Sequence, residues 1–310
     1  MILCLGTTPT VQRSMTFNEL VIDDVNRAVE VSEYASGKSP NVARVLKTMG
    51  ADAMEVGFAG GDRGRFLLQD LEKAGIRCDF VSVPEQTRLC TTVIDRSIGI
   101  ATELVEEHAP VSQASWDEMD AKLRQLLPLA STWIFSGSLP PGAPQDFYAR
   151  WVPLARQQGA RLILDARGLP LKLALSHGGF IAKLNRDELA ATVGRPLDEG
   201  AELIQAVRDA VPVGGAIIIT LGAVGALASD GETFWRLMAP KVKAVSAVGS
   251  GDAFAAGLAL GLERGQTLPE AMALGSACGA ANALTDRAGH LNPADVERLR
   301  KNVVVKEVAT

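Results

Sequence analysis

Cysteine and histidine are scarce in this sequence, and their positions exclude several kinds of site. The 310 residues include four cysteines and three histidines. No cysteine pair has C-x-x-C spacing, and scattered thiols of this kind indicate a reducing compartment rather than a disulfide framework. No two histidines lie close together in the sequence, so a zinc site built on a local motif is not expected.

Long apolar runs and clusters of basic residues are also lacking. The longest apolar stretch, residues 216–228, is interrupted by Thr220, Gly222 and Gly225 and is too short to span a membrane. The apolar run at residues 1–5 is too short for a signal peptide. The formal net charge is −5 without a long Lys/Arg run. We therefore expect a cytoplasmic protein that binds neither nucleic acid nor membrane.

Strands and helices alternate along most of the chain, which predicts an α/β protein with a largely parallel sheet and helices on both faces. Apolar runs predict strands at 1–5, 54–58, 78–83, 132–136, 161–165, 180–183 and 216–220, with a hairpin near 225–237. Helical periodicity predicts helices at 39–49, 65–74, 115–127, 145–158, 186–193, 199–210, 252–264, 268–285 and 293–301. In the first of these helices, Ser39 is expected to be the N-cap.

Two segments, residues 15–34 and 88–105, depart from this alternation because they lack helical periodicity. The second resembles a hairpin, and the two segments are predicted to pair as a small separate sheet. No repeat, linker or low-complexity segment divides the chain. We therefore expect one domain over residues 1–310 with a small β appendage.

A glycine-rich helix start at Gly249–Ser250–Gly251–Asp252 is the clearest local signal. Glycines at a helix entrance leave backbone N–H groups free to meet an anion, and the helix dipole adds positive potential. Two roles are possible for Asp252 at this position. It either balances the dipole in the first turn, which the pattern alone slightly favours because such helix starts are common, or it acts as a base beside a bound phosphate.

Two familiar nucleotide-binding motifs are absent. A P-loop ending in Gly37–Lys38–Ser39 would need glycine five residues before Gly37, where the sequence has Ser32. The dinucleotide fingerprint fails after Gly251, because Phe254 stands where the third glycine belongs. A nicotinamide dehydrogenase is therefore disfavoured.

Three further segments each allow a structural and a functional interpretation. Asn185 with Glu188 forms a capping-box pattern, but the two oxygens also suit a hydrated Mg²⁺. The small-residue loop over 136–142 follows a strand, where open α/β sheets bind ligands, but it also suits a plain turn. Arg88 suits a phosphate contact, although a lone surface arginine is usually only solvated.

Taken together, these segments resemble the ribokinase-like carbohydrate kinases of the phosphofructokinase B type, closest by pattern to tagatose-6-phosphate kinase and 1-phosphofructokinase. Seven segments match in order along nearly the whole chain: 37–44, 87–88 with 102–107, 136–142, 183–189, 220–227, 249–252 and 279–284. The resemblance implies a three-layer α/β/α fold with a mostly parallel sheet. It also implies a small β-sheet lid, formed by about 9–36 and 88–106, that covers the sugar and pairs two subunits as a homodimer.

The resemblance also implies phosphoryl transfer from ATP, with Mg²⁺, to a sugar hydroxyl. Asp252 would be the general base, and the N–H groups of Gly249, Ser250, Gly251 and Asp252 would form an anion hole. Asn185 and Glu188 would hold Mg²⁺ through water. The implied nucleotide contacts are Lys183, Asn185, Thr220, Gly222, Gly225, Gly251 and Asn282.

On the sugar side, the resemblance implies contacts from Gln12, Gly37, Lys38, Asn41, Ser138 and Asp252. Arg27 and Arg88 are the candidates for a phosphate already on the substrate. The sequence departs from the family pattern at Gln12, which replaces a sugar-binding carboxylate, and at Ser39, which replaces a glycine. Leu184 also stands where the family usually has proline.

Three functions follow from this pattern. The first is a kinase for a ketohexose phosphate, either tagatose 6-phosphate or fructose 1-phosphate. The second, motivated by Gln12 and Ser39, is a kinase for an unphosphorylated sugar or a nucleoside. The third is a catalytically weak sugar-phosphate sensor, against which the intact Asp252, Asn185 and Glu188 count.

Overall fold

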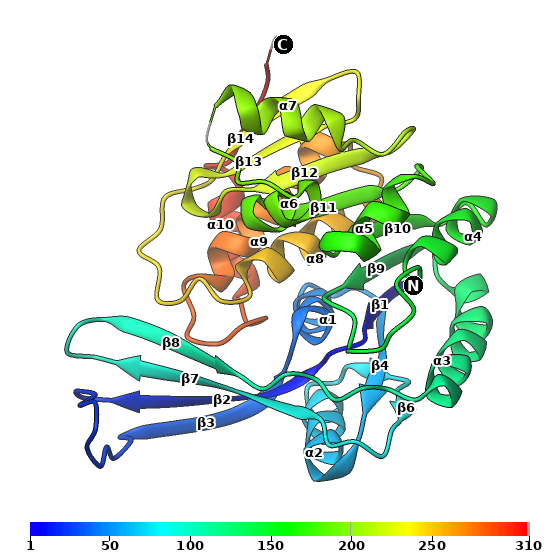
Figure 1. Cartoon of the computed structure of the whole chain (residues 1–310). Coiled ribbons are helices and arrows are strands. Elements are labelled where there is room, and N and C mark those ends of the chain that lie inside the picture. The colour runs from blue at the N-terminus through cyan, green and yellow to red at the C-terminus, as the bar shows by residue number, and fades with distance from the viewer. Residues whose placement is uncertain (199, 309–310) are drawn as a thin grey trace.

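The computed structural model describes residues 1–198 and 200–308, and its core is an eleven-stranded sheet between two layers of helices (Figure 1). The order is β15-β14-β13-β12-β11-β10-β9-β1-β4-β5, with β6 also paired to β4. The pairing is parallel from β5 to β12 and antiparallel over β13–β15. The strands are β1 (Ile2–Gly6), β4 (Ala53–Ala59), β5 (Arg77–Cys78), β6 (Val81–Ser82), β9 (Thr132–Ser136), β10 (Arg161–Asp165), β11 (Ile181–Asn185), β12 (Ala216–Thr220), β13 (Ala226–Ser229), β14 (Phe234–Met238) and β15 (Val304–Glu307).

Helices cover both faces of this sheet, so the predicted three layers are confirmed. One face packs against α3 (Gln113–Leu126), α4 (Val152–Gln157), α5 (Gly168–Leu175), α6 (Arg186–Val193) and α7 (Ala201–Asp209). The other packs against α1 (Lys38–Thr48), α2 (Gly61–Lys73), α8 (Ser250–Glu263), α9 (Leu268–Asn282) and α10 (Pro293–Arg300). Within β12, Ile217 and Ile219 enter one core and Ile218 the other, as expected of a strand buried on both faces.

The two irregular segments form a separate four-stranded sheet, as predicted. Its order is β3-β2-β7-β8, from β2 (Thr10–Phe17), β3 (Glu30–Ser36), β7 (Arg88–Asp95) and β8 (Ile100–Val105). Figure 1 shows this sheet projecting from the main body beneath the α/β/α layers. We call it the lid. Because β2 follows β1 and β3 leads into α1, the lid is continuous with the edge of the main sheet where those elements meet.

Some predicted boundaries are wrong, each for a local reason. The helix predicted at 145–158 is reduced to a 3-10 turn, Ala149–Trp151, and α4, because Pro153 has no N–H for a helical bond. The predicted strand 78–83 is split into β5 and β6, with Phe80 turned over Gly57 between them. Helix α5 and strand β15 were not predicted. The first residue of the predicted helix 199–210 lies outside the described residues.

Helix α1 begins at Lys38, so the prediction that Ser39 caps it is wrong. Gly37 is the N-cap, with a φ of 115° that favours glycine, and no side chain caps the helix. Pro40 fits within the first turn because an N–H there has no intrahelical partner. Helix α2 likewise begins earlier than predicted, at Gly61. No helix within 1–198 and 200–308 combines the length and apolar character needed to cross a membrane.

Helices α8 and α9 pack unusually closely through glycine. A Cβ added at Gly257 would lie 2.8 Å from both Gly275 Cα and Cys278 Sγ. Real Cβ atoms do not approach other atoms this closely, so the two backbones meet only because these side chains are absent. The contact fixes α8, whose first turn carries Asp252.

We predict that Gly257→Ala lowers the free energy of unfolding by about 1–3 kcal/mol, because the added methyl group forces the two helices apart. Intrinsic helix propensity alone predicts the opposite sign, a gain of about 1 kcal/mol. Urea denaturation followed by circular dichroism measures the difference. A variant as stable as the parent would contradict the close contact.

Candidate active site

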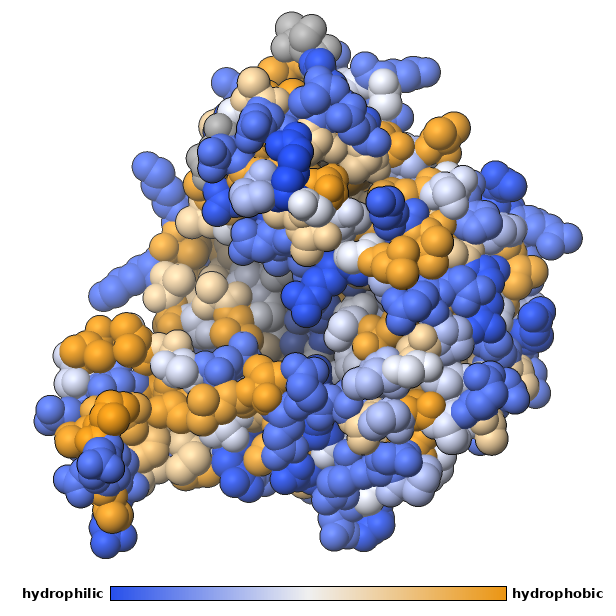
Figure 2. Space-filling view, viewed as in Figure 1, coloured by the Kyte–Doolittle hydropathy of each residue, from blue (hydrophilic) through white to orange (hydrophobic). Residues whose placement is uncertain are grey.

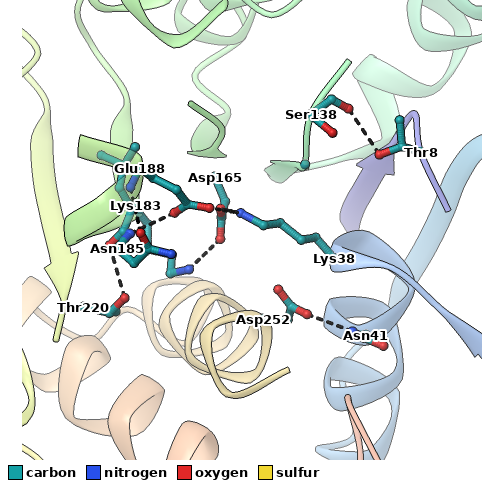
Figure 3. Close-up of polar contacts among 12 residues, drawn as sticks. Thr8, Lys38, Asn41, Ser138, Asp165, Lys183, Asn185, Glu188, Thr220 and Asp252 are labelled. Atoms are coloured by element: carbon teal, nitrogen blue, oxygen red, sulfur yellow. Dashed lines mark hydrogen bonds and ion pairs between the residues drawn. The ribbon is translucent and has the colours of Figure 1, made fainter. Parts of the chain in front are cut away.

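The polar side chains of the candidate site gather where the parallel strands end. Asp165 is the last residue of β10, Lys183 lies within β11, and Asn185 is its last residue. The first turns of α1 and α8 approach the same edge and bring Lys38 and Asp252 (Figure 3). Figure 2 shows this region as a hollow between the lid and the main body. Open α/β sheets bind ligands at this edge.

Asp165 holds two ammonium groups and was missed by the sequence analysis. Its side chain is 1% exposed, and its Oδ2 and Oδ1 lie 2.5 Å from the Nζ atoms of Lys183 and Lys38. Burial alone would raise the pKa of Asp165, but the two ammonium groups hold it below its usual value. The available signal was an acidic residue directly after the apolar run Leu162–Leu164.

Lys38 also contacts Glu188, which has a second role as a helix cap. Lys38 Nζ lies 2.6 Å from Glu188 Oε1. Glu188 Oε2 accepts a hydrogen bond from the Asn185 backbone N–H, and Asn185 Oδ1 accepts one from the Glu188 N–H, both at 2.8 Å. The capping box is therefore confirmed. It leaves one carboxylate oxygen of Glu188 facing the site.

Asp252 lies buried in the first turn of α8, opposite α1. Its Oδ2 accepts a hydrogen bond of 2.8 Å from Asn41 Nδ2, and Asn41 Oδ1 accepts one from Ser36. Burial, followed by the nearby charge of Asp165, raises the pKa of Asp252 to about 7, against the opposing effects of Asn41 and the two lysines. A carboxylate with this pKa is suited to proton transfer near neutral pH.

The loop before α8 is shaped for an anion. Gly249 is the N-cap with a φ of 80°, and a Cβ there would lie 2.7 Å from Ala288 Cβ. Ala253 donates the first intrahelical bond, to Gly249 O, so the N–H groups of Gly251 and Asp252 precede the helical ladder. A Cβ at Gly251 would lie 3.2 Å from Lys183 Nζ, so an ammonium group flanks these N–H groups.

Asn282 and Thr220 support the surrounding loops. Asn282 is fully buried, donates to Val248 O at 2.8 Å, and accepts from Gly289 N at 2.8 Å, so it joins two loops rather than facing open space. Thr220 Oγ1 donates to Leu184 O at the paired ends of β11 and β12. Gly222 and Gly225 bound the 3-10 turn that follows β12, both with positive φ.

On the side expected to bind sugar, two predicted residues face different surroundings. Gln12 is buried, and its Nε2 donates to Thr92 Oγ1 at 2.8 Å within the lid sheet. Ser138 is exposed and lines a cavity of about 320 Å³ together with Tyr148 and Arg167. The Ser138 backbone carbonyl accepts hydrogen bonds from the hydroxyls of the neighbouring threonines, Thr7 and Thr8.

The serine at position 39 is accommodated by two other residues. Ser39 Oγ donates to Glu55 Oε2 at 2.8 Å, and a Cβ added at Gly6 would lie 2.5 Å from Ser39 Cβ. Glu55 is fully buried in β4, and burial raises its pKa well above the usual value. The sequence analysis did not identify Glu55, because one acidic residue in a short strand resembles an ordinary exposed position.

The two candidate phosphate contacts differ in placement. Arg88 is half-buried at the start of β7, where it donates to Thr8 O at 3.1 Å, and its Nε is buried without a partner. Arg27 is exposed in the loop between β2 and β3, at the outer end of the lid. The structure therefore places Arg88 near the site residues of the same chain and Arg27 away from them.

These residues fit a nucleotide with a divalent cation. Within the described residues, no group of three or more His, Cys, Asp or Glu side chains is placed to hold a metal ion. Asp165 and Glu188 nevertheless each direct one oxygen to Lys38, and Mg²⁺ commonly binds through one or two carboxylates together with phosphates and water. The helix start at Gly249–Asp252 and Lys183 would hold the phosphates.

Comparison with known proteins identifies the family. Residues 1–295 match the model of the pfkB family carbohydrate kinases. The chain belongs to this family. It is an ATP-dependent sugar kinase with the ribokinase-like fold, as the sequence resemblance implied.

Several solved structures resemble this PfkB protein over nearly its whole length. Phosphofructokinase-2 from Escherichia coli in complex with potassium has 26% identity and a TM-score of 0.89, covering 97% of this chain and 98% of the other. Its complex with fructose-6-phosphate has the same identity and coverage and a TM-score of 0.86. A possible 1-phosphofructokinase from Thermotoga maritima has 20% identity and a TM-score of 0.90, covers 100% of both chains, and supports the fold alone.

The pKa of Asp252 predicts the pH dependence of the kinase. If Asp252 is the general base, as the resemblance implies, it must be ionised, so kcat/KM is expected to fall as the pH drops through about 7. Asn41→Ala removes a hydrogen bond that lowers this pKa, so it should move the acidic limb to higher pH. The pH profile of kcat/KM for both proteins tests this, and an unchanged apparent pKa in the variant would contradict the role of Asn41.

Proposed function

We propose that this kinase transfers the γ-phosphoryl group of ATP to a hydroxyl of a ketohexose phosphate, tagatose 6-phosphate or fructose 1-phosphate. The observation that carries the proposal is the position of Asp252. It lies in the first turn of α8, beside an anion-binding helix start, and is hydrogen-bonded to Asn41 from the sugar side. On this proposal residues 1–310 act as one kinase domain.

Each site residue has a separate role in the proposed phosphoryl transfer. Asp252 accepts the proton of the attacking hydroxyl, and Asn41 orients its carboxylate. The N–H groups at the Gly249–Asp252 helix start, chiefly those of Gly251 and Asp252, stabilise negative charge on the group in transfer, with Lys183 beside them. The Ser250 N–H already donates to Ala247 O. ATP supplies the phosphoryl group, and Mg²⁺ held through Asn185, Glu188 and water reduces its charge. Thr220, Gly222, Gly225 and Asn282 shape the nucleotide side.

Arg88 is our candidate for the phosphate already on the substrate. Its buried Nε is without a partner, and an arginine fork suits bidentate binding of phosphate. The E. coli phosphofructokinase-2 structure with fructose-6-phosphate supports a sugar phosphate as the ligand class for related proteins. Gln12, Gly37, Lys38 and Ser138 would contact the sugar.

A coupled assay of ADP release tests this proposal. Turnover is expected on tagatose 6-phosphate or fructose 1-phosphate, with fructose 6-phosphate, unphosphorylated hexoses and nucleosides as comparisons. Arg88→Ala should lower kcat/KM for the preferred sugar phosphate by about tenfold or more, equivalent to ~1.4 kcal/mol, because a charged phosphate contact is lost.

Asp252→Asn tests the proposed base, because it keeps the shape of the side chain and removes the carboxylate that accepts the proton. It should abolish turnover while ligand binding persists. Absence of turnover on every sugar phosphate would refute the proposed acceptor. If Arg88→Ala left activity unchanged, an unphosphorylated acceptor would be favoured instead.

We further propose that two copies associate through the lid. Figure 2 shows apolar side chains gathered on the lid surface. Exposed apolar residues of the lid segments include Ile22, 84% exposed, and Leu104, 56% exposed. A patch of this kind on a soluble protein often marks an interface. One E. coli phosphofructokinase-2 structure is tetrameric, which supports oligomerisation among related proteins. Such pairing would carry Arg27 toward the substrate of the second copy.

The double variant Ile22→Asp/Leu104→Asp should convert the dimer to a monomer, because it places charge in the apolar contact. Sedimentation velocity measures the change. Val213→Asp is the control, since Val213 is 86% exposed but lies on the main body. A dimer that survives the lid substitutions, or a monomeric parent protein, would contradict the proposed interface.

A further inference from the structure

The side chain of Lys38 crosses the active site. Lys38 is the first residue of α1, on the side of the site that carries Asn41, yet its ammonium group ends between β10 and α6 (Figure 3). It lies 2.5 Å from Asp165 Oδ1 and 2.6 Å from Glu188 Oε1. The ammonium group therefore lies between two carboxylates, whose negative charges require a nearby cation.

We propose that Lys38 is a tethered counter-ion that holds the place of a divalent cation in the ligand-free protein and leaves both carboxylates when the metal binds. The proposal rests on the proposed function for the identity of the natural ligand, a metal–nucleotide complex. Its geometry comes from the residues of this chain alone.

The remaining contacts of the two carboxylates show which oxygens Lys38 controls. Asp165 Oδ2 pairs with Lys183 at 2.5 Å, and Glu188 Oε2 accepts the Asn185 backbone N–H at 2.8 Å. Departure of Lys38 would leave these contacts in place and free only Oδ1 and Oε1. Because both oxygens lie within contact distance of one nitrogen, they are close enough to bind one hydrated divalent cation.

Charge balance explains why a counter-ion is needed here. Asp165 is 1% exposed and Glu188 is 11% exposed, so neither carboxylate is well solvated. With Lys38 and Lys183, the group contains two negative and two positive charges. Removing Lys38 without replacement would leave one uncompensated negative charge, which is costly away from water. A divalent cation in its place more than offsets that charge, and the surplus positive charge suits the phosphates of a nucleotide.

The side chain of Lys38 is able to leave. It is 33% exposed, so its ammonium can reach solvent or an incoming anion without unfolding α1. Lysine carries a strongly hydrated point charge on a flexible stem, unlike the planar fork of arginine. Since its backbone is fixed beside Gly37 and Asn41, the released ammonium stays near Asp252, where negative charge passes during phosphoryl transfer.

Binding of Mn²⁺ to the whole protein, without nucleotide or sugar, tests the proposal. Electron paramagnetic resonance of free Mn²⁺ gives the dissociation constant. Lys38→Met removes the charge and keeps the length of the side chain, so Mn²⁺ should bind about tenfold or more tightly than in the parent protein. Lys47→Met, in the last turn of the same helix, is the matched control and should leave the affinity unchanged.

A second variant and a second measurement keep the test decisive. Lys38→Gln is also neutral and retains a hydrogen-bond donor, so it should shift the affinity in the same direction and replaces Lys38→Met if that variant folds poorly. Mn²⁺ should raise the melting temperature of the Lys38 variants more than that of the parent. Adding Asp165→Asn to the Lys38 variant should remove the gain.

An Mn²⁺ affinity that is unchanged or weaker in the Lys38 variants would overturn the proposal. The same holds if the double variant with Asp165→Asn keeps the tighter binding. Because the solutions contain no sugar and no ATP, these results are independent of whether a hexose phosphate is the acceptor. Failure of the proposed function and failure of this inference are therefore distinguishable.

Discussion

The site depends on one buried carboxylate. Asp165 ends a central strand where water does not reach it, and its charge is tolerated only because Lys38 and Lys183 both contact it. The two lysines come from positions 127 and 18 residues away in the sequence. Their pairing with Asp165 joins the first turn of α1 to the end of β11. Loss of either lysine would remove one of the two contacts that compensate for the burial of this carboxylate.

The sheet order explains why such distant residues meet. Parallel pairing places the ends of β10, β11 and β12 along one edge, while β1 leads through the lid to α1. Helix α8 reaches the same edge because Gly257 and Gly275 let it pack closely on α9. The Gly249 turn then places Gly251, in the first turn of α8, beside the ammonium group of Lys183. Glycine thus supplies both the close packing and the anion-binding backbone.

Local patterns were predictable from the sequence, whereas isolated charges were not. The capping box at Asn185 and Glu188 and the glycine-rich helix start before Asp252 have signals within a few residues, and each lid segment is marked by its lack of helical periodicity. Asp165 and Glu55 each act through partners distant in sequence, so no spacing marks them. The prediction of one helix over 145–158 was wrong because it gave the helical periodicity more weight than Pro153. This proline lacks the backbone N–H that a continuous helix would need there.

Two departures from the family pattern, at Ser39 and at Gln12, differ in their structural consequences. Ser39 is compensated inside the protein, since Gly6 makes room for its Cβ and Glu55 accepts its hydroxyl. The path of the backbone from Gly37 to Asn41 can therefore be kept, and Asn41 still reaches Asp252. Gln12 is different, because its amide bonds to Thr92 inside the lid. Discrimination between acceptor sugars is therefore expected to depend on the lid more than on α1.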